Sequence, residues 1–156
     1  MATNNRTSGM QELLHEAHLE TMQVSDIGSA RLYELASTRC GGRRTLVFDA
    51  KEQGITVALR QEMPEASPLR GQKPTSTDAL ALLGALTVAL RAQEVDAELI
   101  GGRKGLEAVL LSHRICEPEP SAKQLNKHLD HLLEIAEKLE PALNESGRAA
   151  IDGVLA

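Results

Sequence analysis

Aromatic residues are nearly absent from this chain of 156 residues, which contains one tyrosine, one phenylalanine and no tryptophan. Proteins that bind single-stranded nucleic acid or sugars usually present aromatic rings for stacking, so both classes are disfavoured. A chain of this length is most simply one domain that is large enough to bury a real core. That core has to be built from leucine, alanine, valine and isoleucine.

Membrane-spanning segments and cysteine motifs are also missing. The uncharged part of the most apolar stretch, Ala79 to Leu90, has 12 residues, whereas a membrane-spanning helix needs about 20. Cys40 and Cys116 stand alone and match no metal or redox spacing. Without a signal peptide, such cysteines are typical of a reducing cytoplasm, so we expect a cytoplasmic protein with no membrane contact. The polar residues 1–8 predict a flexible tail ahead of a single domain over 9–156.

The net charge of −5 is unevenly distributed. Residues 26–74 carry 8 Lys/Arg against 6 Asp/Glu, whereas residues 94–156 carry 7 against 12. The acidic total argues against a general nucleic-acid binder. The first half could still present a modest basic patch over residues 31–60, made of Arg31, Arg39, Arg43, Arg44 and Arg60.

The longest apolar stretch runs from Thr77 to Ile100 and predicts one long buried helix. Thr75, Ser76 and Thr77 offer side-chain oxygens that can cap its first turn, and Asp78 adds a negative charge that the helix dipole favours. Gly101-Gly102 is expected to end it. We therefore expect the rest of the chain to pack around this helix.

A rotation of 100° per residue gives the predicted central helix two different apolar faces. One face is bulky, with Leu82, Leu86 and Leu90. The opposite face is small and would let another helix approach closely, either a helix of the same chain or the same helix of a second subunit. The small face consists of Ala81, Gly84, Ala85, Val88 and Ala92.

Other segments with helical spacing suggest a bundle. Helices are expected over 8–24, 29–38, 106–115, 121–140 and from Pro141 to about 152. The helix over 121–140 has a heptad seam that includes Leu125, Leu129 and Leu132, which we regard as a second candidate interaction surface. Because the seam has fewer than three heptads, packing within the same chain is the more common use of such a pattern. Pro141 is expected to break this helix.

One region departs from the helical pattern. Thr45–Asp49 and Ile55–Gln61 are rich in β-branched residues and flank a turn that ends in Gly54, so a β-hairpin is predicted. Three prolines and a glycine between residues 63 and 75 predict a loop. The expected fold is therefore mainly α, a helical bundle around one long central helix with a single hairpin near residues 45–61.

Histidines are the first candidates for chemistry. His15 and His18 are spaced by three residues, as are His128 and His131, and each pair has a glutamate three residues away. Paired Glu-x-x-His helices can hold a metal ion in a bundle, so these four are weak candidate ligands. Their angular position beside the apolar stripes favours solvated histidines instead.

Two glycine pairs followed by basic residues are the second candidates. Arg43 and Arg44 follow Gly41-Gly42, and Arg103 and Lys104 follow Gly101-Gly102. Amides at a helix N-terminus beside such side chains can bind an anion. Neither copy fits a P-loop or a GxGxxG motif, and no cofactor is expected. Glycine helix ends followed by exposed basic residues explain both copies equally well.

Three functions remain open. The leading hypothesis is a non-catalytic cytoplasmic protein that acts through protein–protein interaction, as a regulator, adaptor or immunity-type factor. It would form a homodimer and bind an unknown protein partner. The first alternative is a DNA-binding transcriptional regulator that uses the basic patch over 31–60. The second is a metal-dependent enzyme that uses the Glu-x-x-His helices.

Overall fold

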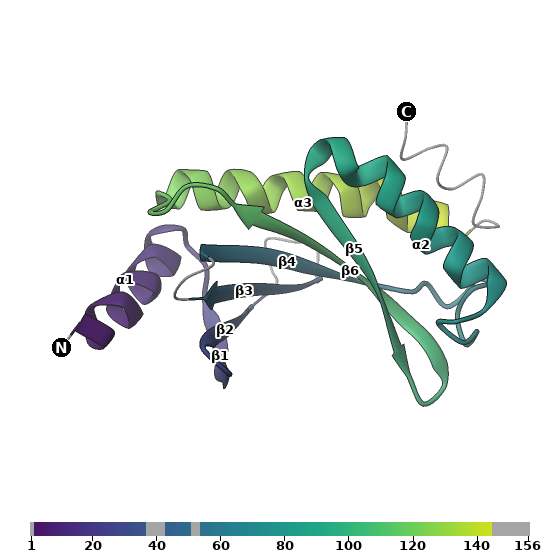
Figure 1. Ribbon diagram of the computed structural model, residues 1–156, viewed down its shortest axis with the longest axis horizontal. Coiled ribbons are helices and arrows are strands. Elements are labelled where there is room, and N and C mark those ends of the chain that lie inside the picture. The colour runs from purple at the N-terminus through teal and green to yellow at the C-terminus, as the bar shows by residue number, and fades with distance from the viewer. Residues whose placement is uncertain (1, 37–42, 51–53, 145–156) are drawn as a thin grey trace.

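A single antiparallel sheet of six strands dominates the computed structural model, which describes residues 2–36, 43–50 and 54–144 (Figure 1). Strands follow one another across the sheet in the order β1-β2-β3-β4-β6-β5. Three consecutive hairpins supply the six strands, and one helix precedes, one interrupts and one follows them. The elements are α1 (Ala2–Glu16), β1 (Thr21–Ile27), β2 (Ala30–Leu35), β3 (Arg44–Ala50), β4 (Gly54–Glu62), α2 (Thr77–Leu90), the 3-10 turn η1 (Arg91–Gln93), β5 (Val95–Gly102), β6 (Gly105–Ile115) and α3 (Ala122–Asn144).

The predicted helical bundle is therefore wrong. The hairpin near residues 45–61 is present as β3 and β4, in register from Arg44 opposite Arg60 to Ala50 opposite Gly54. It is one of three hairpins in the described chain, because the segments 29–38 and 106–115 that were expected to be helices contain β2 and β6. Residues 63–75 connect β4 to α2 without a helix or strand.

The second half of the predicted central helix is a strand. The first half forms α2 as expected, and its N-cap is Ser76, whose Oγ accepts a hydrogen bond from the amide of Ala79 at 3.1 Å. After Leu90 the chain makes η1 and reverses at Glu94, which has a left-handed φ of 57°. The alternating segment that starts at Val95 then forms β5 at the sheet edge.

Strand β6 looked helical in the sequence because it is buried on both faces in its middle. Ala108 and Val109 are consecutive and both fully buried, so the apolar residues do not alternate cleanly. A short continuous apolar run cannot be assigned to helix or strand from its period alone. The segment forms a strand because it pairs with β4 on one side and with β5 on the other.

Helix α3 covers the centre of the sheet and closes the core. Its heptad residues Leu125, Leu129 and Leu132 are fully buried, and it packs against β4 and β6. Pro141 lies on the exposed side within α3 and does not break it, so the predicted break is wrong. The final helix expected after Pro141 falls mostly on residues 145–156, outside the described residues.

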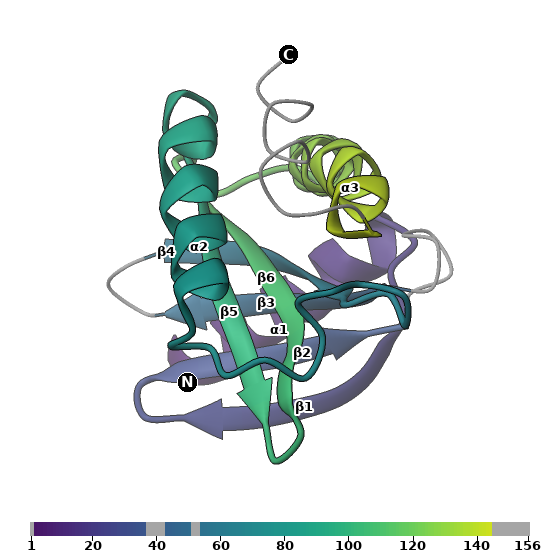
Figure 2. The same ribbon diagram turned by 90° about the vertical axis from the view of Figure 1, so that its right-hand side faces the viewer.

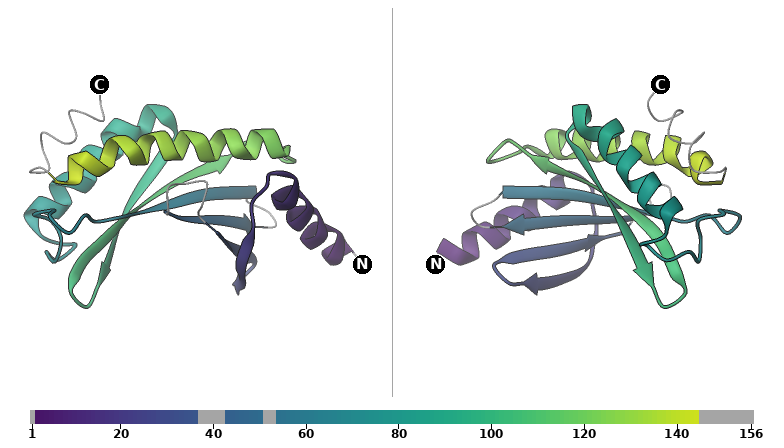
Figure 3. Two further views of the ribbon diagram at one scale, coloured as in Figure 1. Left: turned by 180° about the vertical axis from the view of Figure 1, so that it is seen from behind. Right: turned by 45° about the vertical axis from the view of Figure 1, so that its right-hand side comes forward.

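Helices α2 and α3 lie on the same side of the sheet (Figure 2). Two further views show that neither helix covers the opposite face (Figure 3). The buried face carries Tyr33, Val47 and Val57 in register across β2, β3 and β4. No helix in the described part of the chain has the length and apolarity that crossing a membrane requires.

We expect Gly105→Ala to destabilise the fold. Gly105 has a φ of +98°, and a Cβ there would lie 2.4 Å from the carbonyl oxygen of Gly71, which belongs to the connection between β4 and α2. Strain and backbone overlap together should cost about 1–3 kcal/mol of unfolding free energy, measured by urea denaturation. Gly9→Ala is the control, because a Cβ at Gly9 meets nothing within 4 Å. Equal stabilities of the two variants would contradict the observed contact.

Tyr33 provides a second test of the core. Burial raises its pKa above the ordinary tyrosine value, and the neighbouring Arg31 opposes this effect. Tyr33 is the only tyrosine, so phenolate absorbance during an alkaline titration reports this side chain alone. We expect it to ionise above the ordinary value of about 10. The stability that the neutral phenol contributes is then present below pH about 10 and is lost as the pH rises through the raised pKa. Ionisation at the free-tyrosine pKa in the folded protein would contradict its burial.

Candidate interaction surfaces

Helix α2 leaves an apolar strip uncovered, and we call it the α2 stripe: Leu80, Ala81, Gly84, Val88 and Ala92, the last lying in η1. Leu80 is 53% exposed and Val88 is 66% exposed. A Cβ built at Gly84 meets no atom within 4 Å, so the described chain leaves open space at this position of the helix. The stripe contains no charged side chain.

The α2 stripe follows directly from how α2 packs. Its bulky face, with Leu82, Leu86 and Leu90, is buried against the sheet, and α2 lies mainly over β5. The predicted small face is therefore turned outward, and of its members only Ala85 is half-buried. Helix α3 packs on β4 and β6 and does not cover the small face.

The heptad leucines of α3, unlike the α2 stripe, are buried inside the chain. Leu125, Leu129 and Leu132 are at most 1% exposed and lie in the hydrophobic core, so the chain itself occupies the surface that they form. The sequence could not distinguish these leucines from a seam between subunits, because both require the same spacing.

A second apolar surface lies at one edge of the sheet. Strand β1 pairs only with β2 among the described strands. We call Met22, Val24 and Ile27 the β1 edge; they are 69%, 43% and 54% exposed. The opposite edge, β5, carries exposed Asp96 and Glu98, the kind of charge that discourages further strand pairing, whereas the one acidic residue of β1, Asp26, is paired with Arg31. The two edges therefore differ in their capacity to accept another strand.

The α2 stripe and the β1 edge together hold every large hydrophobic side chain that is exposed in the described residues. These are Met22, Val24, Ile27, Leu80 and Val88. Single exposed apolar residues are ordinary on protein surfaces, but clusters of them mark contact sites. The sequence identified the small face of α2 and missed the β1 edge, because residues 8–24 were expected to be one helix.

The basic patch does not present free positive charge. Arg31 Nε lies 2.9 Å from Asp26 Oδ1, and Arg43 Nη2 lies 2.8 Å from Glu140 Oε2. Arg43 also donates to Gln61 Oε1 at 2.6 Å.

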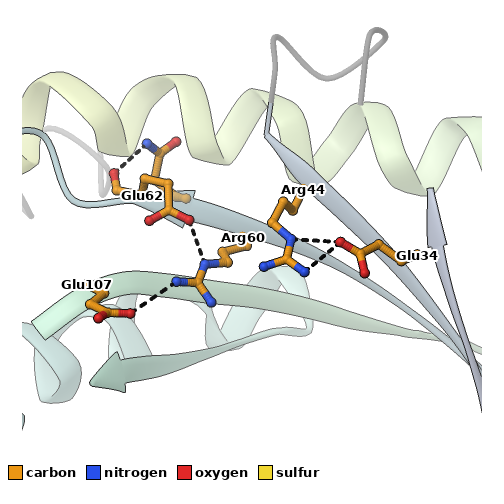
Figure 4. A network of polar contacts seen from close by, with 6 residues as sticks. Glu34, Arg44, Arg60, Glu62 and Glu107 are labelled. Carbon is orange, nitrogen blue, oxygen red and sulfur yellow. Dashed lines mark hydrogen bonds and ion pairs between the residues drawn. The ribbon is translucent and has the colours of Figure 1, made fainter. Parts of the chain in front are cut away.

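The two remaining described arginines of the patch lie on the uncovered face of the sheet (Figure 4). Arg44 donates to Glu34 through Nε at 2.9 Å. Arg60 lies between two carboxylates, with Nε 2.6 Å from Glu62 and Nη2 3.5 Å from Glu107. All four described arginines of the patch thus face a carboxylate, and Arg39 lies outside the described residues. This leaves little unpaired charge for a phosphate backbone.

The other basic pair lies at a hairpin turn. Arg103 and Lys104 are exposed in the turn that connects β5 to β6, so they do not begin a helix as the sequence suggested. A cavity of about 520 Å³ next to Lys104 is also lined by Arg70, Glu62 and Glu107, and its charges are mixed. Arg43 and Arg44 lie at the start of β3, where they make the ion pairs described above.

The two histidine pairs are placed differently. His15 and His18 are exposed at the end of α1, with His18 in a left-handed conformation. His128 and His131 on α3 both face His113 on β6, with ring centroids 4.7 Å and 6.5 Å from that of His113. Among the described residues, no three histidine, cysteine or carboxylate side chains are placed, as they stand, so that they could hold a metal ion.

His113 is the member of this group that the sequence did not connect with the others. It is 7% exposed, and its Nδ1 lies 2.9 Å from the carbonyl oxygen of Glu94. His128 Nε2 lies 3.4 Å from Glu117 Oε2. The pKa of Glu117 is lowered, first by a hydrogen bond from its own backbone amide and further by the nearby His128 and His113, while burial opposes the shift. Glu117 therefore remains a carboxylate at neutral pH.

Comparison with protein-family models and with curated protein sequences finds no match to this chain.

Proposed function

We propose that this chain is a non-catalytic protein that acts through protein–protein contacts and forms a homodimer through the α2 stripe. The observation that carries the proposal is the gathering of all large exposed hydrophobic side chains of the described residues on α2 and β1. A regulator, an adaptor and an immunity-type factor all fit such a protein. A cytoplasmic location belongs to the same proposal and is supported by the exposed free Cys116.

A second copy of the chain suits the α2 stripe because the stripe is uncharged and built mainly from small residues. In a two-fold symmetric contact the same patch meets itself, so like charges would repel across the axis. No charged residue lies between Ala79 and Leu90. Gly84 and its alanine neighbours allow two helix backbones to approach closely, and Leu80 and Val88 supply the apolar area.

The β1 edge supplies a separate surface for a protein partner. An edge strand has backbone amides and carbonyls without partners, and an extended segment of another protein can pair with them. The exposed Met22, Val24 and Ile27 would add side-chain contacts to such pairing. Dimerisation at α2 and partner binding at β1 then use different elements of the fold.

Gly84→Leu tests the dimer most cleanly. The chain has open space at Gly84, and leucine is a better helix former than glycine by roughly 0.5–1 kcal/mol. The variant monomer should therefore be at least as stable as the unmodified chain, whereas the dimer should weaken by tenfold or more, which corresponds to about 1.4 kcal/mol. Sedimentation velocity over a concentration series measures the association, and urea denaturation measures the stability.

Val88→Glu and Ile27→Glu form a matched pair, since each adds one carboxylate to an exposed apolar position. We expect Val88→Glu to shift the protein to monomers and Ile27→Glu to leave the dimer intact. Dimers that persist in both Gly84→Leu and Val88→Glu would overturn the assignment to α2. Loss of the dimer in Ile27→Glu alone would move self-association to the β1 edge.

A further inference from the structure

Three histidines converge where α3 crosses the end of β6, although they come from distant parts of the chain. His113 lies near the end of β6, and His128 and His131 lie one turn apart on α3. All three line one cavity of about 390 Å³, together with Glu117 and Cys116. These are nitrogen, oxygen and sulfur donors of the kinds that bind Zn²⁺ and related transition metals.

The hydrogen bond of His113 fixes which of its nitrogens is available. The carbonyl oxygen of Glu94 can only accept, so the Nδ1 of His113, at 2.9 Å, carries the proton. In the neutral ring Nε2 then holds the lone pair. A histidine whose other nitrogen donates to a backbone carbonyl has the tautomer and orientation of a typical metal ligand.

The distances between the imidazole rings are close to those expected for histidines that bind one metal ion. With metal–nitrogen bonds of about 2.0–2.1 Å, two imidazoles on one tetrahedral ion have centroids roughly 5 Å apart. The separations from His113 are 4.7 Å to His128 and 6.5 Å to His131, on either side of this value. Rotation of the two half-buried rings on α3 can bring their nitrogens toward the buried His113, which stays fixed.

Glu117 supplies the fourth candidate ligand. Its Oε2 is 3.4 Å from Nε2 of His128, and it is held as a carboxylate at neutral pH. Of the other charged groups around the cavity, Lys127 is repulsive and Glu94 is attractive to a cation. Rotation of His128 away from Glu117 would leave this carboxylate free to bind the ion.

We propose that His113, His128, His131 and Glu117 form a binding site for a divalent transition metal of the Zn²⁺ class, which joins α3 to β6. The four proposed ligands share no residue with the α2 stripe or with the β1 edge. Bound metal should therefore stabilise the packing of α3 on the sheet and leave self-association through α2 unchanged.

Cobalt(II) is a suitable probe, because its visible absorption reports nitrogen and oxygen coordination and Zn²⁺ should displace it. We expect the unmodified chain to bind one Co²⁺ near neutral pH and to melt at a higher temperature with Zn²⁺. His131→Asn, at a half-buried position, should weaken binding by about tenfold or more, and Glu117→Gln should weaken it by a similar factor. His113→Asn should abolish binding, provided that circular dichroism shows a folded chain.

The exposed pair on α1 provides the control, because His15 and His18 repeat the spacing of His128 and His131 without a third histidine. The double variant His15→Asn/His18→Asn should bind Co²⁺ as the unmodified chain does. Failure of the unmodified chain to bind Co²⁺ or Zn²⁺ would overturn the proposal. Binding that survives in His131→Asn and Glu117→Gln but is lost in the α1 double variant would overturn it equally.

Discussion

The packing of α3 on the neighbouring strands β4 and β6 is the contact on which the rest of the fold depends. Leu125, Leu129 and Leu132 are buried against the face that carries Val57 and Leu111, so one helix covers these two strands. Among the described elements, α2 alone is left to cover the β5 end, and α2 does so with its bulky leucines. Because a helix on the outside of a sheet can bury only one face, the small face of α2 is left in solvent. The α2 stripe is thus a consequence of the core.

Charged and apolar side chains are distributed differently over the described surface. The described arginines of the basic patch face carboxylates, and such exposed ion pairs add little to stability while they neutralise charge. The exposed apolar side chains, in contrast, are concentrated on two elements. The histidine group lies apart from both surfaces, at the junction of α3 with β6, where bound metal would act on the stability of that junction.

The sequence predicted those features that depend on local chemistry. The cap at Ser76, the two faces of α2, the hairpin of β3 and β4 and the amphipathic α3 all leave a short-range signature. The sequence prediction was wrong for β6, because the middle of this strand is buried on both faces. It was also wrong for β5, because its alternating residues directly follow the apolar helix and were read as part of that helix. Those errors hid the β1 edge and the approach of His113 to His128, because each requires knowledge of which strands are neighbours. The heptad seam left two alternatives open, because its spacing is the same whether an element of the same chain or another subunit covers it.

In the proposed homodimer, a second copy of the chain covers the α2 stripe. Methyl NMR with a soluble paramagnetic agent measures this cover, through the broadening of Val88 and Leu80 signals compared with that of Ile27 at the β1 edge. At high protein concentration we expect weak broadening for Val88 and Leu80 and strong broadening for Ile27, and on dilution all three should broaden strongly. Strong broadening of Val88 and Leu80 at every concentration would show that no second copy covers the stripe and would rule out the homodimer through α2.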